Sequence, residues 1–204
     1  MEQAIIEALA ELRKEKQRKF DQTVELIINL QKFDIKKESV NLFVQLPHQV
    51  SSRKICGFLT KKSDLIDTIT KSDFEKYKVK KDIKKLVKEY DFFVSHASLM
   101  PSVATTFGKY LGPAGKMPSP QLGILTSEDD ATVNSLLEKV NHTARVKSKE
   151  PSLKIAIGKV SMKDQEVAKN ILQVYNAVLN TVSKEKIKSV MLKFTMTKPL
   201  KIKI

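Results

Sequence analysis

The chain has 204 residues, of which 41% are hydrophobic and 29% charged, as is typical of a folded protein able to form two domains with modest cores. Its formal net charge of +14 indicates a polyanionic partner, either nucleic acid or an anionic membrane surface. No apolar run reaches the roughly 18 residues of a membrane helix, and the single cysteine excludes internal disulfides and zinc knuckles, so we expect a cytoplasmic protein.

The N-terminal part of the chain predicts one helix and two strands. Residues 2–12 carry apolar side chains at helical spacing. Residues 23–30 alternate between apolar and more polar side chains, which predicts a strand with one buried face. A second strand is expected at residues 40–46, and Pro47 ends it because proline cannot continue a central strand.

The middle of the chain alternates between strands and helices. Apolar strands are predicted at residues 55–59 and 92–94. Helical patterns accompany them, one beginning near Lys62 and the others over residues 80–90, 99–110 and 129–140. Strands that are apolar on both faces and alternate with helices favour a small parallel-sheet α/β unit.

The C-terminal part predicts a strand, a helix and a strand. We expect a strand at residues 153–157, a long helix at 164–182 and a terminal strand over 189–204. Within the terminal strand one face is apolar, and the alternation includes Met196 in that buried face.

The two ends of the chain are expected to fold together, because neither alone would form a comfortable core. The predicted fold is a split α+β two-layer sandwich, with two helices over an antiparallel-type sheet, and an inserted Rossmann-like parallel α/β domain. The sandwich is assigned to residues 1–49 and 142–204, and the inserted domain to residues 50–141. Loops at residues 47–52 and 141–151 are the predicted hinges.

Positive charge is concentrated at the C-terminal end. Residues 142–204 carry fourteen basic and four acidic side chains, whereas residues 1–50 carry eight of each. Five further basic residues cluster early, namely Arg13, Lys14, Lys16, Arg18 and Lys19. If both ends share one domain, these charges form one positive face that suits nucleic acid.

Two features of the predicted sandwich suit RNA. The more polar face of the terminal strand carries Lys193, Thr195 and Thr197, which can contact phosphates and sugars, although an ordinary half-buried strand fits the same pattern. Phe20 follows the early basic cluster directly. An aromatic ring beside basic residues can stack on an RNA base, although a phenylalanine is more often part of a core.

The glycine- and proline-rich segment at residues 111–120 matches no phosphate-binding loop. Tyr110 stands where the first glycine is required, and Met117 stands where a Ser or Thr must bind magnesium. Gly112 and Gly115 fit the glycine-x-x-glycine spacing of KH-type RNA-binding loops, and a tight surface turn explains them equally well. The three histidines lie far apart in sequence, and we expect no metal, cofactor or catalytic constellation.

Four segments resemble the L-one family of large-subunit ribosomal proteins, the proteins of the mobile stalk. They are residues 18–26, 46–48, 111–120 and 194–196, in the family's order and spacing. The resemblance implies a two-domain fold whose first domain is built from both termini. It also implies a protein that is monomeric when free and binds large-subunit ribosomal RNA in the large ribosomal subunit. Further implied partners are its own messenger RNA, whose translation it represses, and transfer RNA leaving the exit site, past which the inserted domain swings.

The resemblance implies the RNA contacts position by position. Two residues depart from the family pattern: Thr197 stands where glycine is usual, and Ala114 stands where arginine is common. The implied RNA-binding residues are Lys19, Phe20, Gln22, Thr23, Glu25, Lys149, Lys154, Ser189, Thr195 and Met196.

Two other functions fit part of the sequence. A nucleotide-binding α/β enzyme would use the glycine-rich segment, and the failed phosphate-loop match argues against it. A free KH-like RNA regulator outside the ribosome would use the Gly112–Gly115 spacing. We expect a ribosomal RNA-binding protein without enzymatic activity.

Overall fold

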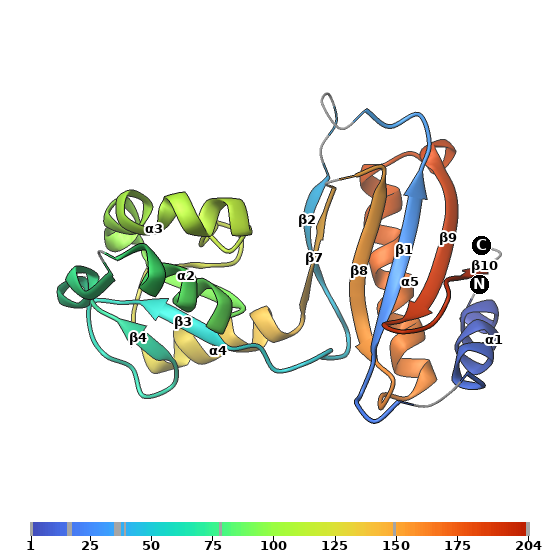
Figure 1. Ribbon diagram of the computed structural model, residues 1–204, viewed down its shortest axis with the longest axis horizontal. Helices are drawn as coiled ribbons and strands as arrows, with labels where there is room; N and C mark the ends of the chain where they lie inside the picture. The colour runs from blue at the N-terminus through green and yellow to red at the C-terminus, as the bar shows by residue number, and fades with distance from the viewer. Residues whose placement is uncertain are drawn as a thin grey trace. The chain divides into compact units, whose positions relative to one another are not determined.

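The chain folds into two compact units (Figure 1). The first unit combines Met1–Ser51 with His142–Ile204, and the second is Ser52–Asn141. This computed structural model describes residues 2–15, 18–34, 38, 40–77, 79–148 and 150–202.

An antiparallel sheet of four strands, in the order β10-β9-β1-β8, forms the centre of the first unit. Strand β1 comes from the N-terminal end and pairs with β8 on one side and with β9 on the other, both from the C-terminal end (Figure 1). The strands are β1 (Thr23–Leu30), β8 (Ser152–Lys159), β9 (Ile187–Phe194) and β10 (Leu200–Ile202).

Two helices, α1 (Glu2–Arg13) and α5 (Asp164–Thr181), pack on one face of this sheet. Residues of β1 alternate strictly between buried and half-buried, so that Val24, Leu26 and Ile28 join the helices in one core. Burying each such side chain contributes about 1.5–3 kcal/mol. The predicted two-layer α+β sandwich is therefore confirmed.

A separate two-stranded sheet joins β2 (Asn41–Gln45) to β7 (Thr143–Lys147). Backbone hydrogen bonds continue beyond the strands, since Leu46 N donates to the His142 carbonyl at 2.6 Å. Strand β7 lies inside the segment predicted as a hinge, residues 141–151. Its sequence, TARVK, is too short and mixed to carry an alternation, and its extended form depends on pairing with β2.

The buried side chain of Asn170 on α5 ties the chain after β2 to this core. Its Oδ1 accepts from His48 N at 3.0 Å, and its Nδ2 donates to the His48 and Ile157 carbonyls, both at 3.0 Å. Because Asn170 is fully buried, these bonds satisfy polar backbone groups that water does not reach.

The second unit is built on a parallel sheet in the order β4-β3-β5-β6. Helices α2 and α3 share a core with one face, and α4 shares a core with the other, as expected for a Rossmann-like α/β unit. The strands are β3 (Ile55–Phe58), β4 (Asp67–Ile69), β5 (Phe92–His96) and β6 (Ile124–Leu125), and the helices are α2 (Lys80–Glu89), α3 (Met100–Ala114) and α4 (Asp130–Asn141).

Two expectations for the second unit are wrong. No α-helix begins near Lys62, because the chain there bends into the short strand β4 and then into the 3₁₀ helix η1 (Lys71–Tyr77). Helix α3 extends to Ala114 and thus includes part of the glycine-rich segment. Strands of two or three residues carry no periodic signal, which explains why β4 and β6 were not predicted. The remaining short helices are η2 (Ala97–Leu99) and η3 (Lys184–Lys186).

We expect Asn170→Ala to lower the free energy of unfolding by about 1–3 kcal/mol, because the substitution leaves buried backbone groups without partners. Urea unfolding followed by far-ultraviolet circular dichroism measures this change. Asn176→Ala is the matched control, since Asn176 is an exposed asparagine of the same helix. Equal effects of the two substitutions would contradict the role given to Asn170.

Candidate nucleic-acid interface

The face of the four-stranded sheet opposite α1 and α5 forms an open sheet face of polar, basic and a few apolar side chains. On β1, Ile27 lies between Met191 of β9 and Lys154 of β8, and neither Ile27 nor Met191 belongs to the core of the unit. The open sheet face consists of Thr23, Glu25, Ile27, Asn29, Ser152, Lys154, Ala156, Lys159, Ser189, Met191, Lys193 and Lys201.

Cross-strand contacts hold the polar groups of the open sheet face in place. Asn29 Nδ2 donates to Ser189 Oγ at 3.0 Å, and Ser152 Oγ donates to Asn29 Oδ1 at 2.9 Å. Lys193 Nζ lies 3.9 Å from Glu25 Oε2. These strands are rigid supports, so the face presents a fixed pattern of donors, acceptors and charge, as shape-selective recognition requires.

The expected terminal strand is in fact two strands, joined by a turn at residues 195–199. Strand β9 ends at Phe194, and β10 runs back beside it. Thr23 N donates to Thr195 Oγ1 and Thr195 N donates to the Thr23 carbonyl, each at 3.1 Å. Met196 N donates to Gln22 Oε1 at 3.1 Å. The turn is therefore fixed against the start of β1.

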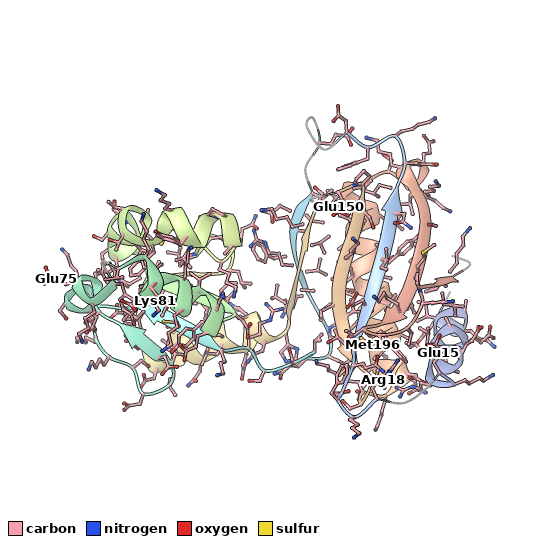
Figure 2. All side chains as sticks on the ribbon, in the orientation of Figure 1. Glu15, Arg18, Glu75, Lys81, Glu150 and Met196 are labelled. Atoms are coloured by element: carbon pink, nitrogen blue, oxygen red, sulfur yellow. The ribbon has the colours of Figure 1, made fainter. Side chains whose placement is uncertain are left out.

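Two large apolar side chains project into solvent in or near this turn. Phe20 is 53% exposed and Met196 is 57% exposed. The alternation placed Met196 on the buried face, and this is wrong because β9 ends before it. Phe20 lies outside the core, contrary to the usual preference of phenylalanine. Figure 2 shows Met196 and Arg18 at one end of the first unit.

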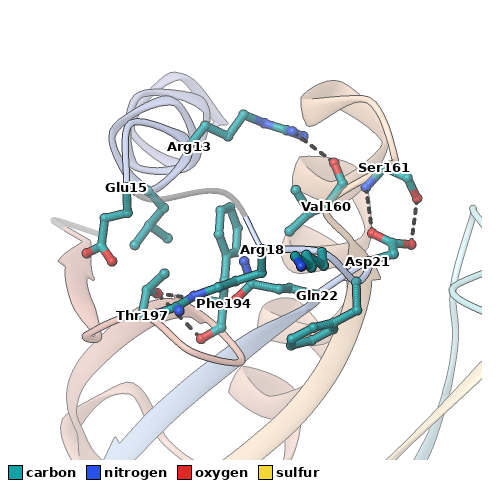
Figure 3. A pocket seen from close by; sticks show the side chains of 12 residues that line it. Arg13, Glu15, Arg18, Asp21, Gln22, Val160, Ser161, Phe194 and Thr197 are labelled. Atoms are coloured by element: carbon teal, nitrogen blue, oxygen red, sulfur yellow. Dashed lines mark hydrogen bonds between the residues drawn. The ribbon is translucent and has the colours of Figure 1, made fainter.

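A pocket of about 450 Å³ lies next to the turn (Figure 3). Its walls come from the end of α1, the segment before β1, the turn after β8, and the β9–β10 turn. Arg13 fixes one wall, because its guanidinium donates to Asp164 Oδ1 at 2.9 Å and to the Val160 carbonyl at 2.8 Å. Asp21 fixes another by accepting from Ser161 N at 3.1 Å and from Ser161 Oγ at 2.9 Å.

The structure brings most of the predicted RNA-binding residues onto one surface. Five of them lie at or beside the turn, namely Lys19, Phe20, Thr23, Thr195 and Met196. Three more lie on the strands of the adjoining open sheet face, namely Glu25, Ser189 and Lys154. Lys149 lies outside the described residues.

Gln22 differs from the other predicted residues because it is only 5% exposed. Its carboxamide holds the backbone of Met196 in place and lines the pocket. This geometry gives the Gln22 side-chain oxygen a positioning role.

Sequence reasoning did not single out several members of this surface. Lys159 Nζ donates to Thr23 Oγ1 at 3.0 Å, and Lys201 lies beside Met191 on the neighbouring strand. Asn29 bridges two strands. The alternation in the sequence already indicated that these side chains point away from the core. It did not show their partners across the sheet, because β1 pairs with strands more than a hundred residues away.

The glycine-rich segment has a structural role in the second unit. Gly115 ends α3 with a φ of 70°, a conformation that favours glycine, and its N donates to the Gly112 carbonyl at 2.9 Å. Lys116 Nζ then donates to the carbonyls of Val87 at 2.8 Å and Tyr90 at 2.7 Å, at the C-terminal end of α2. The segment is the end of a helix and not a KH-type loop.

The carboxyl edge of the parallel sheet, where α/β folds usually bind ligands, contains a carboxylate of the chain itself. Glu128 accepts from Thr60 N at 2.7 Å, Thr60 Oγ1 at 2.6 Å and Lys61 N at 3.2 Å. Burial acts to raise the pKa of Glu128, but these hydrogen bonds outweigh it and lower the pKa. The backbone donors that a phosphate would need are occupied, which argues against a nucleotide-binding enzyme.

No group of three or more His, Cys, Asp or Glu side chains in the described ranges could hold a metal ion. Within the same ranges, no helix is both long and apolar enough to cross a membrane.

Comparisons with known proteins agree on one family. The model of the Ribosomal protein L1p/L10e family matches residues 12–198. The large ribosomal subunit protein uL1 of Pyrobaculum neutrophilum is 35% identical, covering 94% of this chain and 89% of the relative. The uL1 proteins of Pyrococcus abyssi and Thermococcus kodakarensis are each 33% identical over 98% of this chain, covering 96% and 97% of their own lengths. The similarity spans both units.

We expect Lys116→Ala to reduce the stability of the second unit by about 1–2 kcal/mol, because α2 loses two charge-assisted hydrogen bonds at its C-terminal end. Hydrogen exchange of the α2 amides measures the change. Lys109→Ala on the exposed face of α3 is the control for lost charge. Unchanged exchange in α2 would exclude this capping role.

Proposed function

Since the chain belongs to the Ribosomal protein L1p/L10e family, we propose that it binds large-subunit ribosomal RNA as a structural protein of the large ribosomal subunit. The family consists of ribosomal proteins and not of enzymes. The proposed RNA contact lies in the first unit, on the open sheet face and the adjoining turn at residues 195–199. The proposed location is the cytoplasmic ribosome.

One observation carries the proposal most directly. Met196 is exposed within the turn at residues 195–199, which hydrogen bonds hold against the start of β1, and Phe20 is exposed two residues before Gln22, which binds this turn. Two large apolar side chains exposed together are unfavourable in water, and they suit the sugar and base surface of a folded RNA. The turn needs no rearrangement to present them.

Basic residues around the turn supply the electrostatic part of binding. Lys154, Lys193 and Lys201 lie on the open sheet face, and Lys19 lies beside Phe20. Each phosphate that such a side chain neutralises releases condensed counterions, so the affinity depends on salt. Charge attracts the RNA, and the shape of the fixed face selects among RNA structures.

Two finer functions follow from the resemblance to the stalk family. We infer that a similar structure in the chain's own messenger RNA binds the same face, so that free protein represses its translation. We also infer that the second unit moves as transfer RNA leaves the exit site. Both inferences assume that the RNA is held by the first unit.

The substitutions Phe20→Ala and Thr195→Ala should each weaken binding to the stalk ribosomal RNA by about 1–3 kcal/mol, because the first removes a stacking contact and the second a polar contact that bound RNA would bury. Filter binding at fixed salt measures the affinities. Thr181→Ala replaces an exposed threonine on α5, away from the open sheet face, and should change the affinity by less than about 0.5 kcal/mol. If all three variants bind alike, the proposed contact surface is wrong.

A chain joining residues 1–49 to 142–204 through a short Gly/Ser linker should fold and bind the same RNA within about tenfold of the full chain. Linker closure costs little, because loop entropy grows only logarithmically with length. Circular dichroism tests folding, and filter binding tests affinity. A cooperatively folded chain that binds no RNA would move the binding site to the second unit.

A further inference from the structure

The pocket beside the turn has the size and lining of a ligand site, and the proposed function does not require it (Figure 3). Its volume of about 450 Å³ lies within the usual range for small-molecule pockets. Leu12, Val160 and Phe194 give it apolar walls, and Phe20 also lines it while remaining 53% exposed.

One side-chain donor that lines the pocket is open to a ligand. Gln22 is 5% exposed, and its Oε1 is already used as the acceptor for Met196 N at 3.1 Å. Its Nε2 makes no hydrogen bond to any described residue and is not a fully buried atom, so solvent or a ligand can reach it. An amide nitrogen so placed is stabilised by an incoming acceptor.

The charged groups of the pocket divide into two sets. Arg13 and Asp21 are engaged in fixing the walls. Arg18, Lys19 and Glu15, in contrast, line the pocket, are exposed, and make no side-chain hydrogen bond or ion pair within the described ranges. The first set fixes the walls, and the second leaves two cationic groups and a carboxylate for a ligand.

We propose that this pocket receives one unstacked nucleotide of the bound RNA, with its base against the apolar walls and its phosphate on Arg18 and Lys19. The proposal rests on the proposed function and specifies which part of the bound RNA enters the pocket beside the turn. Phe20 at the pocket can stack on the entering base, as aromatic side chains do with splayed-out nucleotides.

The lining favours a nucleotide over simpler ligands. Free phosphate would use Arg18 and Lys19 but leave the apolar walls and the Gln22 amide unused. An aliphatic ligand would leave the charged groups unused. A nucleobase edge offers both acceptors and donors, which match the Gln22 Nε2 and the Glu15 carboxylate, and its ring is flat and apolar.

The test uses the full chain and mononucleotides, so that it does not depend on ribosomal RNA. The four 5′-ribonucleoside monophosphates and ribose 5-phosphate are titrated separately and followed by protein NMR. We expect at least one nucleotide to bind with a Kd of about 1 mM or tighter, and ribose 5-phosphate to bind at least about tenfold more weakly. Equal binding of ribose 5-phosphate, or no binding of any nucleotide, would overturn the proposal.

Variants assign binding to this pocket. Arg18→Ala should weaken nucleotide binding by about fivefold or more, as expected for a charge-assisted contact of about 1 kcal/mol. Lys14→Ala removes an equal charge on an exposed residue that does not line the pocket, and should weaken it less than about twofold. Equal losses would place the nucleotide elsewhere and overturn the proposal.

A second variant tests the amide nitrogen of Gln22. Gln22→Glu keeps an acceptor for Met196 N but replaces the donating nitrogen, so it should weaken nucleotide binding by about tenfold while thermal unfolding shows a folded chain. A folded variant that binds nucleotide normally would contradict the pocket geometry. If mononucleotides bind as predicted but Phe20→Ala and Thr195→Ala leave ribosomal RNA binding unchanged, the proposed function fails while the pocket assignment stands.

Discussion

The position of β1 between β8 and β9 is the constraint on which the first unit depends. A strand from the first thirty residues pairs along its length with two strands that begin more than a hundred residues later. This pairing brings both ends of the chain together and leaves the second unit as one continuous segment. It also divides the side chains of β1, because alternate residues enter the core with α1 and α5 while the others form the open sheet face.

The same pairing fixes the turn at residues 195–199, which lies at one end of the proposed RNA-binding surface. Backbone and side-chain hydrogen bonds between Thr23 and Thr195 extend the β1–β9 ladder into the turn. Next to this pair, Gln22 Oε1 accepts a hydrogen bond from Met196 N and so fixes the following residue of the turn. The ends of β1 and β9 thus determine where the turn, Phe20 and the neighbouring pocket lie. The positions of these strand ends vary little once the sheet has formed. A surface of this kind is suited to recognising a folded RNA by shape.

In the second unit, residues that look functional in the sequence have partners inside the fold. Lys116 caps α2, Gly115 ends α3, and Glu128 binds the backbone amides at the carboxyl edge of the sheet. Glycine and lysine beside each other suggest a phosphate site only when their donors remain available. Here Lys116 donates to carbonyls at the end of α2, and Glu128 accepts from the backbone amides of Thr60 and Lys61. These residues therefore stabilise the second unit.

The sequence by itself determined the long periodic elements, the concentration of positive charge and the two fold classes. Strand β1 and helix α5 were predictable because alternation and helical spacing are local and repeat over many residues. The sequence also contained the candidate residues of the surface from Lys19 to Met196, through resemblance to a family. Tertiary structure decided the short strands β4, β6 and β7, the exposure of Phe20 and Met196, and the burial of Gln22. These features depend on which distant segment supplies a hydrogen-bond partner, and no local pattern contains that information.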